Sequence, residues 1–483
     1  MKKFLSILLV AIMLVSVLAG CGKKTATDDG EVPTLIYYVP GNTQADESLV
    51  EEAINAIAVP KIGAKVDLNF IDFSAWTEKM NNKMAANEYF DLSCGYALNN
   101  FQLVDNGCTL ALDELLETEA PALKAQVPDY MWEQTKFNGE IHFVPNEQIA
   151  CSSEGIVVRK ELADEFGLNL DEINVISDLE PFWQFVKEKH PDLIPYRMSN
   201  ASHFYPDVHG KQFSTEGYHT SLIFVDFETM KVGATPECYT KEVADFAYDL
   251  SLKGYFREDR SGADDSSYMA SGRYASWYAW CMPGCEAEFK KSYGGYDYVT
   301  KILTPKPTMS ATSALATTTF VSAYTKYPEK SIKFVELLNT DKEIYNLITF
   351  GIEGRHYEKI DEKYIKVIEG SGYYTNSGWA FGCQWNAYLQ EGQEPDVWEQ
   401  TKKLNDEAIK SPIAGLTIDT SEIIMELNQC EKVQQKYLVS RINRAVGDPD
   451  TYWEDYKKEL KMAGIDKVIE CYQTQIDAFL ANK

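Results

Sequence analysis

Hydrophobic and polar residues in the first hundred positions follow two alternating periods. Runs at 34–39, 65–70 and 90–95 are apolar or alternate strictly, which predicts three strands. The segments between them have apolar residues at helical spacing: Leu49, Ala53, Ile54 and Ile57 in the first, and Trp76, Met80 and Met84 in the second. Ser74 is expected to cap the second helix. This strand–helix order predicts a parallel sheet, with ligands at the carboxyl ends of its strands.

The middle of the chain predicts a hairpin, a further strand and several helices. Asn138-Gly139 has the composition of a tight hairpin turn, and residues 155–158 have strand character. Helices are expected at 159–166, after a capping-box pattern at 177–180, and at 240–252. Between 196 and 238 the pattern resolves neither helix nor strand.

The last third of the chain is mostly helical by pattern. Pro328 is placed at the first turn of a helix, and Gly464 separates the last two helices, which predicts a helical hairpin. The expected helices are 328–338, 341–350, 395–410, 421–438, 449–462 and 465–480.

The N-terminus has the layout of an export signal. Lys2 and Lys3 precede an apolar run at 4–18, which is shorter than the ~20 residues that a spanning helix needs. The string Leu18-Ala19-Gly20-Cys21 resembles a bacterial lipobox, in which the cysteine is lipidated and becomes the new N-terminus. An ordinary signal peptide with an incidental cysteine is the alternative. Residues 1–20 are therefore the expected signal peptide and 21–33 a flexible tether.

Charge and composition restrict the classes of partner and ligand that the chain can bind. The 483-residue chain has a formal net charge of −27, which argues against a nucleic-acid partner and against capture of anionic ligands. Aromatic residues make up 12%, enough to suggest aromatic surface with a function. Cys21 is one of ten cysteines, so nine remain, and this odd, scattered set is interpreted mainly as small buried hydrophobic residues.

Several strings, in order along the chain, resemble one bacterial family. They are 84–91, 107–113, 138–145 (with His142 where the family has tyrosine) and 269–275 (with Met269 and Arg273 substituted). These resemble the extracellular solute-binding proteins of ABC importers, family 1, the maltose-binding type. The segments 328–339, 351–357, 411–412, 448–449 and 462–466 resemble a lipoprotein subgroup with a long helical C-terminal domain of unassigned role.

This resemblance implies an α/β, two-lobed periplasmic-binding-protein type II fold with a central ligand cleft and an added helical C-terminal region. The first lobe is expected at 34–145 and 305–340, and the second, with the C-terminal helices, at 146–304 and 341–483. Crossovers between the lobes are expected near 144–148, 303–307 and 340–341. The implied function is a lipid-anchored receptor on the extracellular face of the cell membrane, with palmitate on its anchor. The receptor is expected to be a monomer without cofactor, metal or catalytic residues that delivers a solute, an oligosaccharide first of all, to an ABC permease.

A sugar site needs aromatic plates together with carboxylates and amides. In the broader family a stacking tryptophan follows the segment that matches 269–275, which implies Trp277. Because Trp277 and Trp280 are three residues apart, a regular strand turns at most one of them to the cleft, and Trp277 is preferred. The expected ligand-binding residues are Tyr38, Asn42, Tyr96, Asn99, Glu147, Gln148, Trp277, Trp379 and Trp385. Core aromatics and ordinary loop polar groups are the alternative interpretation of each.

Other functions and sites are weighed against this one. A cell-surface glycoside hydrolase would use two carboxylates, but with 73 acidic residues such pairs decide nothing. A peptide-binding importer receptor and an adhesion or structural lipoprotein are further alternatives. Glu353, Arg355 and His356 are interpreted as ordering the lobe junction. Two metal sites are disfavoured, one at Cys281 and Cys285 and the other at His203, Asp207, His209 and His219.

Overall fold

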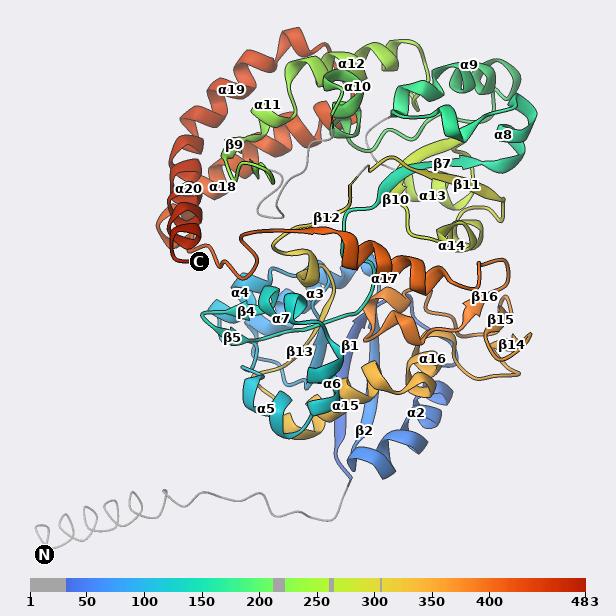
Figure 1. Cartoon of the computed structure of the whole chain (residues 1–483), viewed down its shortest axis with the longest axis vertical. Helices are drawn as coiled ribbons and strands as arrows, with labels where there is room; N and C mark the ends of the chain where they lie inside the picture. Colours follow the sequence, from blue (N-terminus) through green and yellow to red (C-terminus); the bar gives the residue numbers. More distant parts are fainter. Residues whose placement is uncertain (1–31, 212–221, 260–264, 305) are drawn as a thin grey trace, which may run out of the picture.

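The chain forms two lobes with the C-terminal helices packed on one of them, as Figure 1 shows. The structure is a computed structural model that describes residues 32–211, 222–259, 265–304 and 306–483. The expected signal peptide, Cys21, most of the tether and His219 lie outside these ranges. Within them, no helix is both long enough and apolar enough to cross a membrane.

The first lobe is built on a mixed five-stranded sheet in the order β2-β1-β3-β13-β6. Its strands are β1 (Thr34–Pro40), β2 (Lys65–Ile71), β3 (Leu92–Cys94), β6 (Val144–Pro145) and β13 (Thr318–Val321). β1 pairs in parallel with β2 and β3, as the sequence predicted, whereas β13 is antiparallel to both of its neighbours.

Two helices cross between these parallel strands, α2 (Glu47–Ile62) and α3 (Phe73–Ala85). Trp76, Met80 and Met84 are buried on α3, as predicted. On α2 the buried face differs from the predicted one and consists of Val50, Ile54, Ala58 and Ile62, while Leu49 is 39% exposed. The cap of α3 is also two residues earlier than predicted, because the carboxylate of Asp72 accepts from the backbone N–H of Ser74.

The remainder of the first lobe comes from two separate parts of the chain. The first part contains α4 (Asn100–Asp105), α5 (Asp113–Thr118), α6 (Pro121–Gln126), α7 (Asp129–Gln134), β4 (Lys136–Phe137) and β5 (Glu140–Ile141). Asn138-Gly139 forms the predicted hairpin turn, with both residues at positive φ. The second part contains α15 (Pro328–Thr340), α16 (Lys342–Phe350), β14 (Tyr357–Lys359), β15 (Tyr364–Val367), β16 (Leu389–Gln390) and α17 (Val397–Glu407).

The second part of the first lobe extends further than the sequence indicated. Ile344, Tyr345 and Ile348 of α16 are fully buried in the same core as β1 and α2. Thr340 and Asp341 form a tight turn between α15 and α16, and Asp341 caps α16 and pairs with Lys61 of α2. This corrects the assignment of 341–408 to the second lobe and of 340–341 to a crossover, because burial of the α16 face keeps the chain in the first lobe.

The second lobe contains an antiparallel sheet in the order β10-β7-β11. Its strands are β7 (Glu154–Arg159), β10 (Ser276–Trp280) and β11 (Tyr298–Ile302), with a separate ribbon of β8 (Ile223–Val225) and β9 (Val232–Ala234). Its helices are α8 (Lys160–Phe166), α9 (Glu180–Lys189), α10 (Tyr205–His209), α11 (Thr235–Cys238), α12 (Lys241–Leu252), α13 (Asp265–Ala270) and α14 (Cys285–Ser292). The capping role predicted for Ser177 falls to Asp178, whose carboxylate accepts from the backbone N–H of Asn174 and Val175.

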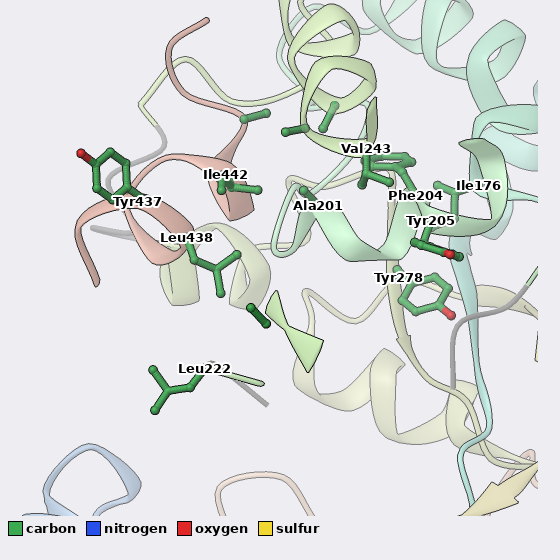
Figure 2. Packing of buried hydrophobic residues seen from close by; sticks show 14 of the residues in the cluster. Ile176, Ala201, Phe204, Tyr205, Leu222, Val243, Tyr278, Tyr437, Leu438 and Ile442 are labelled. Atoms are coloured by element: carbon green, nitrogen blue, oxygen red, sulfur yellow. The ribbon is translucent and has the colours of Figure 1, made fainter. Parts of the chain in front are cut away.

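The C-terminal helices complete the core of the second lobe. They are α18 (Ile424–Gln434), followed by a π-helical turn, α19 (Trp453–Met462) and α20 (Ile465–Ala481). Gly464 has φ 96° between the last two, so they form the predicted hairpin. Tyr437, Leu438 and Ile442 belong to the same core as Ala201 and Val243, and Figure 2 shows them together.

Three segments cross between the lobes. The first, at 146–153, leads from β6 to β7, and the second leads from β11 through β12 (Thr308–Met309) towards β13, both close to the predicted positions. The third is β17 (Ile409–Lys410), which pairs in parallel with β12. Because the crossing segments are hydrogen-bonded to one another, they form one short hinge region rather than three independent linkers.

The cysteines in the described ranges fit the interpretation as small buried residues. Seven are buried and free, and Cys471 is partly exposed.

Candidate functional site

A cavity of about 1550 Å³ lies between the two lobes at the hinge. Its lining includes the crossing segments through Gln148, Ser152 and Thr308, the second lobe through Trp280, and the first lobe through Trp379. Typical pockets for drug-sized molecules have volumes of ~300–1000 Å³, so this cavity has room for a larger ligand.

Trp280 of the second lobe lies at the end of β10 and lines the cavity with 53% of its surface exposed. It sits opposite Glu154 of β7, which also lines the cavity. Trp277 does not line it, which corrects the predicted preference. That ring is 3% exposed and packs on Phe289 and Tyr298 at centroid distances of 5.8 and 5.0 Å, because α14 covers its face of the sheet.

Trp379, one of the expected ligand-binding residues, lines the large cavity from the first lobe, although the sequence assigned its segment to the second lobe. Its ring packs against Tyr96 at 4.8 Å and Phe73 at 6.0 Å between centroids. Tyr96 follows β3, and its carbonyl oxygen accepts a 2.6 Å hydrogen bond from the buried indole N–H of Trp76. Trp379 is therefore held in a cluster of aromatic rings that is connected to the lobe core.

Acidic side chains share the cavity with these aromatic rings. Burial raises the pKa of Glu154, and it raises the pKa of Glu288 on α14 to about 7. The remaining charged residues of the lining are Asp226, Glu228, Lys211, Lys306 and Lys410. Because both signs of charge are present beside aromatic surface, the cavity suits a ligand with many hydroxyl groups and apolar faces.

A second cavity of about 410 Å³ lies beside α6, α7 and α17. Three of the predicted ligand residues meet there: Glu147, Gln148 and Trp385. Gln148 also lines the large cavity, so the first crossing segment contributes to both cavities.

The remaining predicted residues line neither cavity. Tyr38 packs against Phe90, and its hydroxyl accepts from Lys83 at 3.1 Å. The exposed Asn42 accepts through its backbone carbonyl oxygen from the side-chain amide of Gln44, and Asn99 caps α4 by accepting from the backbone N–H of Gln102. The side chains of Tyr38 and Asn99 therefore make local contacts and line neither cavity.

Sequence reasoning missed the acidic part of the large cavity. Glu154 is the first residue of β7, directly after a crossing segment, and that position is a usable signal. The sequence around Glu288 contains no such signal, because the position of Glu288 in the cavity depends on how α14 packs against the loop around Trp379.

Two further groups were singled out in the sequence: Glu353, Arg355 and His356, expected at the lobe junction, and the candidate metal ligands. The Asp46 carboxylate lies 2.7 Å from the guanidinium of Arg355 and 3.1 Å from Nε2 of the buried His356, while Glu353 pairs with Lys359. These contacts lie within the first lobe rather than at the lobe junction. In the described ranges there is no group of three or more histidine, cysteine or acidic residues arranged to hold a metal ion.

Known protein sequences match this chain in two ways, one over its C-terminal part and one over its full length. A family model described as a domain of unknown function (DUF3502) matches residues 412–481, which begin just after β17. A protein of Streptococcus pneumoniae serotype 4 (strain ATCC BAA-334 / TIGR4), named carbohydrate ABC transporter substrate-binding protein, is 27% identical over 502 residues, covering 100% of this chain and 99% of the relative.

Solved structures agree with this relationship at the level of the fold. The N-glycan transport solute binding protein NgtS from Streptococcus pneumoniae is 24% identical with a TM-score of 0.82, covering 93% of this chain and 99% of that one. An extracellular solute-binding protein from Bifidobacterium longum subsp. infantis is 16% identical with a TM-score of 0.64, covering 94% and 100%. The chain is therefore a relative of the solute-binding proteins of ABC transporters and has their two-lobed α/β fold.

Proposed function

We propose that this chain is the extracellular, lipid-anchored receptor of an ABC importer and that it binds an oligosaccharide between its lobes. One observation carries the proposal: Trp280 from the second lobe and Trp379 from the first line the same large cavity beside carboxylates. Indole faces contact the C–H faces of sugar rings, and the carboxylates accept hydrogen bonds from hydroxyls.

The relatives support an oligosaccharide of N-glycan type as the first ligand to test. Structures of NgtS in complex with Man5GlcNAc and with Man1GlcNAc have TM-scores of 0.77 and 0.78 to this chain. A cavity of about 1550 Å³ is large enough for a branched ligand of that kind.

Transport is coupled to binding through the hinge. A ligand that touches Trp280 and Trp379 at once makes more contacts when the lobes approach each other, and only such differential contact shifts the equilibrium towards closure. The closed form is then the one that a permease recognises. The proposed role is capture and delivery, without conversion of the sugar.

The anchor rests on the sequence at Cys21. A lipid at this position, followed by the polar segment, would keep the receptor near its permease at high effective concentration. Labelling of cells with tritiated palmitate tests this: the wild-type chain should carry label and sediment with membranes, and Cys21→Ala should be unlabelled and released. Equal membrane retention of both forms would contradict the anchor.

Ligand binding is tested by thermal unfolding against Man5GlcNAc, Man1GlcNAc, other oligosaccharides and peptides. A ligand present at 100 times its Kd adds about 2.7 kcal/mol to the free energy of unfolding, which gives a measurable rise in Tm. A rise with an oligosaccharide, and an unchanged sugar after incubation, support the receptor. A rise only with peptides, or release of shorter sugars, would support instead a peptide receptor or a glycoside hydrolase.

A further inference from the structure

The second cavity has the chemistry of a ligand site of its own. We call it the hinge pocket and define it by Gln126, Glu147, Trp385, Asn386, Lys402 and Asp406. At about 410 Å³ it is about a quarter of the volume of the large cavity, and Gln148 of the first crossing segment lines both. Apart from Gln148, no residue that the structure describes lines both cavities, so the hinge pocket is distinct from the proposed oligosaccharide site.

The walls of the hinge pocket are held by buried hydrogen bonds. Asn405 of α17 is 5% exposed, and its side-chain oxygen accepts from the backbone N–H of Ala150 and Cys151 at 2.8 and 3.2 Å. Its side-chain amide donates to the carbonyl oxygen of Gln148 at 2.7 Å. The amide of Gln126 donates to the Glu147 carboxylate. The pocket is therefore preformed, which reduces the entropic cost of binding.

Trp385 provides a flat apolar surface in a pocket of mixed character, whose lining also includes Pro128, Tyr130, Met131 and Cys383. Its ring is partly exposed and is supported by Trp398, with centroids 6.0 Å apart. The ammonium of Lys402 lies 5.5 Å from the centroid of the Trp385 ring. A partly exposed indole that lines a pocket beside polar groups offers an apolar surface to a sugar ring.

The polar groups around this indole suit hydroxyl groups. Lys402 and Asp406 are exposed and one helical turn apart on α17, and among the described residues neither has an ion-pair partner. Glu147 is 8% exposed and presents its carboxylate to the pocket. Donors and acceptors of both charges beside one aromatic plate favour a neutral polyhydroxyl ligand over an ion.

From these features we propose that the hinge pocket binds a neutral mono- or disaccharide, independently of the large cavity. The volume of about 410 Å³ is in the lower part of the range of small-molecule pockets, ~300–1000 Å³, so a longer chain does not fit inside it. The inference rests on the geometry of the pocket and stands whether or not the large cavity takes an oligosaccharide.

Saturation-transfer NMR of the full-length mature protein with mannose, glucose, N-acetylglucosamine and maltose tests the proposal. At least one sugar should give saturable binding, and Trp385→Ala should weaken it at least tenfold. Trp385→Phe should recover most of the binding, whereas Trp280→Ala, which removes the ring in the large cavity, should leave it unchanged. Because Lys402 and Asp406 are exposed, Lys402→Met and Asp406→Ala will fold, and each should weaken binding severalfold.

Three outcomes would overturn the proposal. The first is no binding of any of these sugars at millimolar concentration. The second is binding that survives Trp385→Ala, Lys402→Met and Asp406→Ala. The third is binding lost in Trp280→Ala alone, which would assign the sugar to the large cavity. Oligosaccharide binding measured on the same variants separates these results from failure of the proposed function, because Trp385→Ala is expected to leave that affinity unchanged.

Discussion

The indole of Trp379 meets the ring of Tyr96 edge to face, with centroids 4.8 Å apart and planes inclined at 62°. The two residues are far apart in the sequence, and Tyr96 in turn is fixed through the indole N–H of Trp76. One wall of the large cavity is thus connected to the core of the first lobe, whereas Trp280 on the opposite wall is 53% exposed.

Removal of the Tyr96 ring should therefore weaken ligand binding without direct loss of a ligand contact. An aromatic pair contributes ~0.5–1.5 kcal/mol, so Tyr96→Ala is expected to raise the oligosaccharide Kd by up to about tenfold. Tyr96→Phe keeps the ring and should bind like the wild type. Isothermal titration calorimetry measures both, and equal affinity of all three proteins would show that Trp379 needs no support.

Trp277 and Trp280 should respond in opposite ways to substitution by alanine. Trp277→Ala removes a buried ring and is expected to lower the free energy of unfolding by about 3–5 kcal/mol. Trp280→Ala should change it by less than about 0.5 kcal/mol, as is usual for exposed positions, and should weaken oligosaccharide binding. Chemical unfolding and titration of both variants test this; a large stability loss in Trp280→Ala would mark that ring as part of the core.

Glu288 should make stability depend on pH. Burial raises its pKa from 4.5 to about 7, so between these values the folded protein keeps a proton that the unfolded chain has released. Stability from this residue is therefore highest at low pH and falls as pH rises from about 4.5 to 7. Glu288→Gln should reduce that slope and be more stable than the wild type at about pH 8, measured by urea unfolding across the range.

Glu47 is the matched control for this experiment. Burial, with the nearby charges of Glu51 and Asp67, raises its pKa to about 7 as well, but Glu47 lies at the start of α2 and does not line the large cavity. Glu47→Gln should flatten the stability profile similarly and leave the pH dependence of oligosaccharide binding intact. Only Glu288→Gln should alter the latter, and identical binding profiles would contradict a position of Glu288 at the ligand.

Asn405 should be important for the hinge itself. Asn405→Ala leaves two buried backbone N–H groups and one partly buried carbonyl oxygen of the first crossing segment without their partner, and an unsatisfied buried group costs about 1–3 kcal/mol. Asn405→Asp keeps the acceptor but loses the donor to Gln148, so an intermediate loss of stability is expected. Thermal unfolding gives the ranking, and a neutral Asn405→Ala would mean that water replaces the side chain.

The C-terminal helices should not be separable from the rest of the chain. Ile465, Val468 and Ile476 of α20 belong to the same buried core as Ile156 and Trp183. A chain that ends at residue 411 exposes this core, so we expect it to lose the cooperative unfolding of the second lobe and to aggregate. A soluble truncated protein with the wild-type Tm would instead identify residues 412–481 as an independent domain.

Periodicity predicted the local elements well because it depends on neighbours in the sequence. The order of β1, α2, β2, α3 and β3 and the helical hairpin at Gly464 follow from spacing alone. The face of α2 was shifted by one residue, since Leu49 and Val50 are equally apolar and only packing on the sheet distinguishes them.

Assignment to a lobe and direction of side chains could not be predicted in this way. Whether α16 continues the first lobe depends on its contacts with α2, which are distant in sequence. Alternation along β10 separates Trp277 from Trp280, but which of them is covered depends on α14. Glu147 and Trp385 were expected to bind the ligand, but they line the smaller cavity and not the large one, and this difference depends on contacts between segments far apart in the sequence.

The core shared by β7 and α20 has a consequence for the order of folding. When synthesis has reached about residue 408, every strand of the first lobe is present, and that lobe can close around β1. The buried core to which Ile156 belongs still lacks the residues of α18, α19 and α20, because these helices come from the last part of the chain. The core of the second lobe therefore cannot be completed before the final helix is synthesised. Until then its exposed apolar surface can bind chaperones or aggregate.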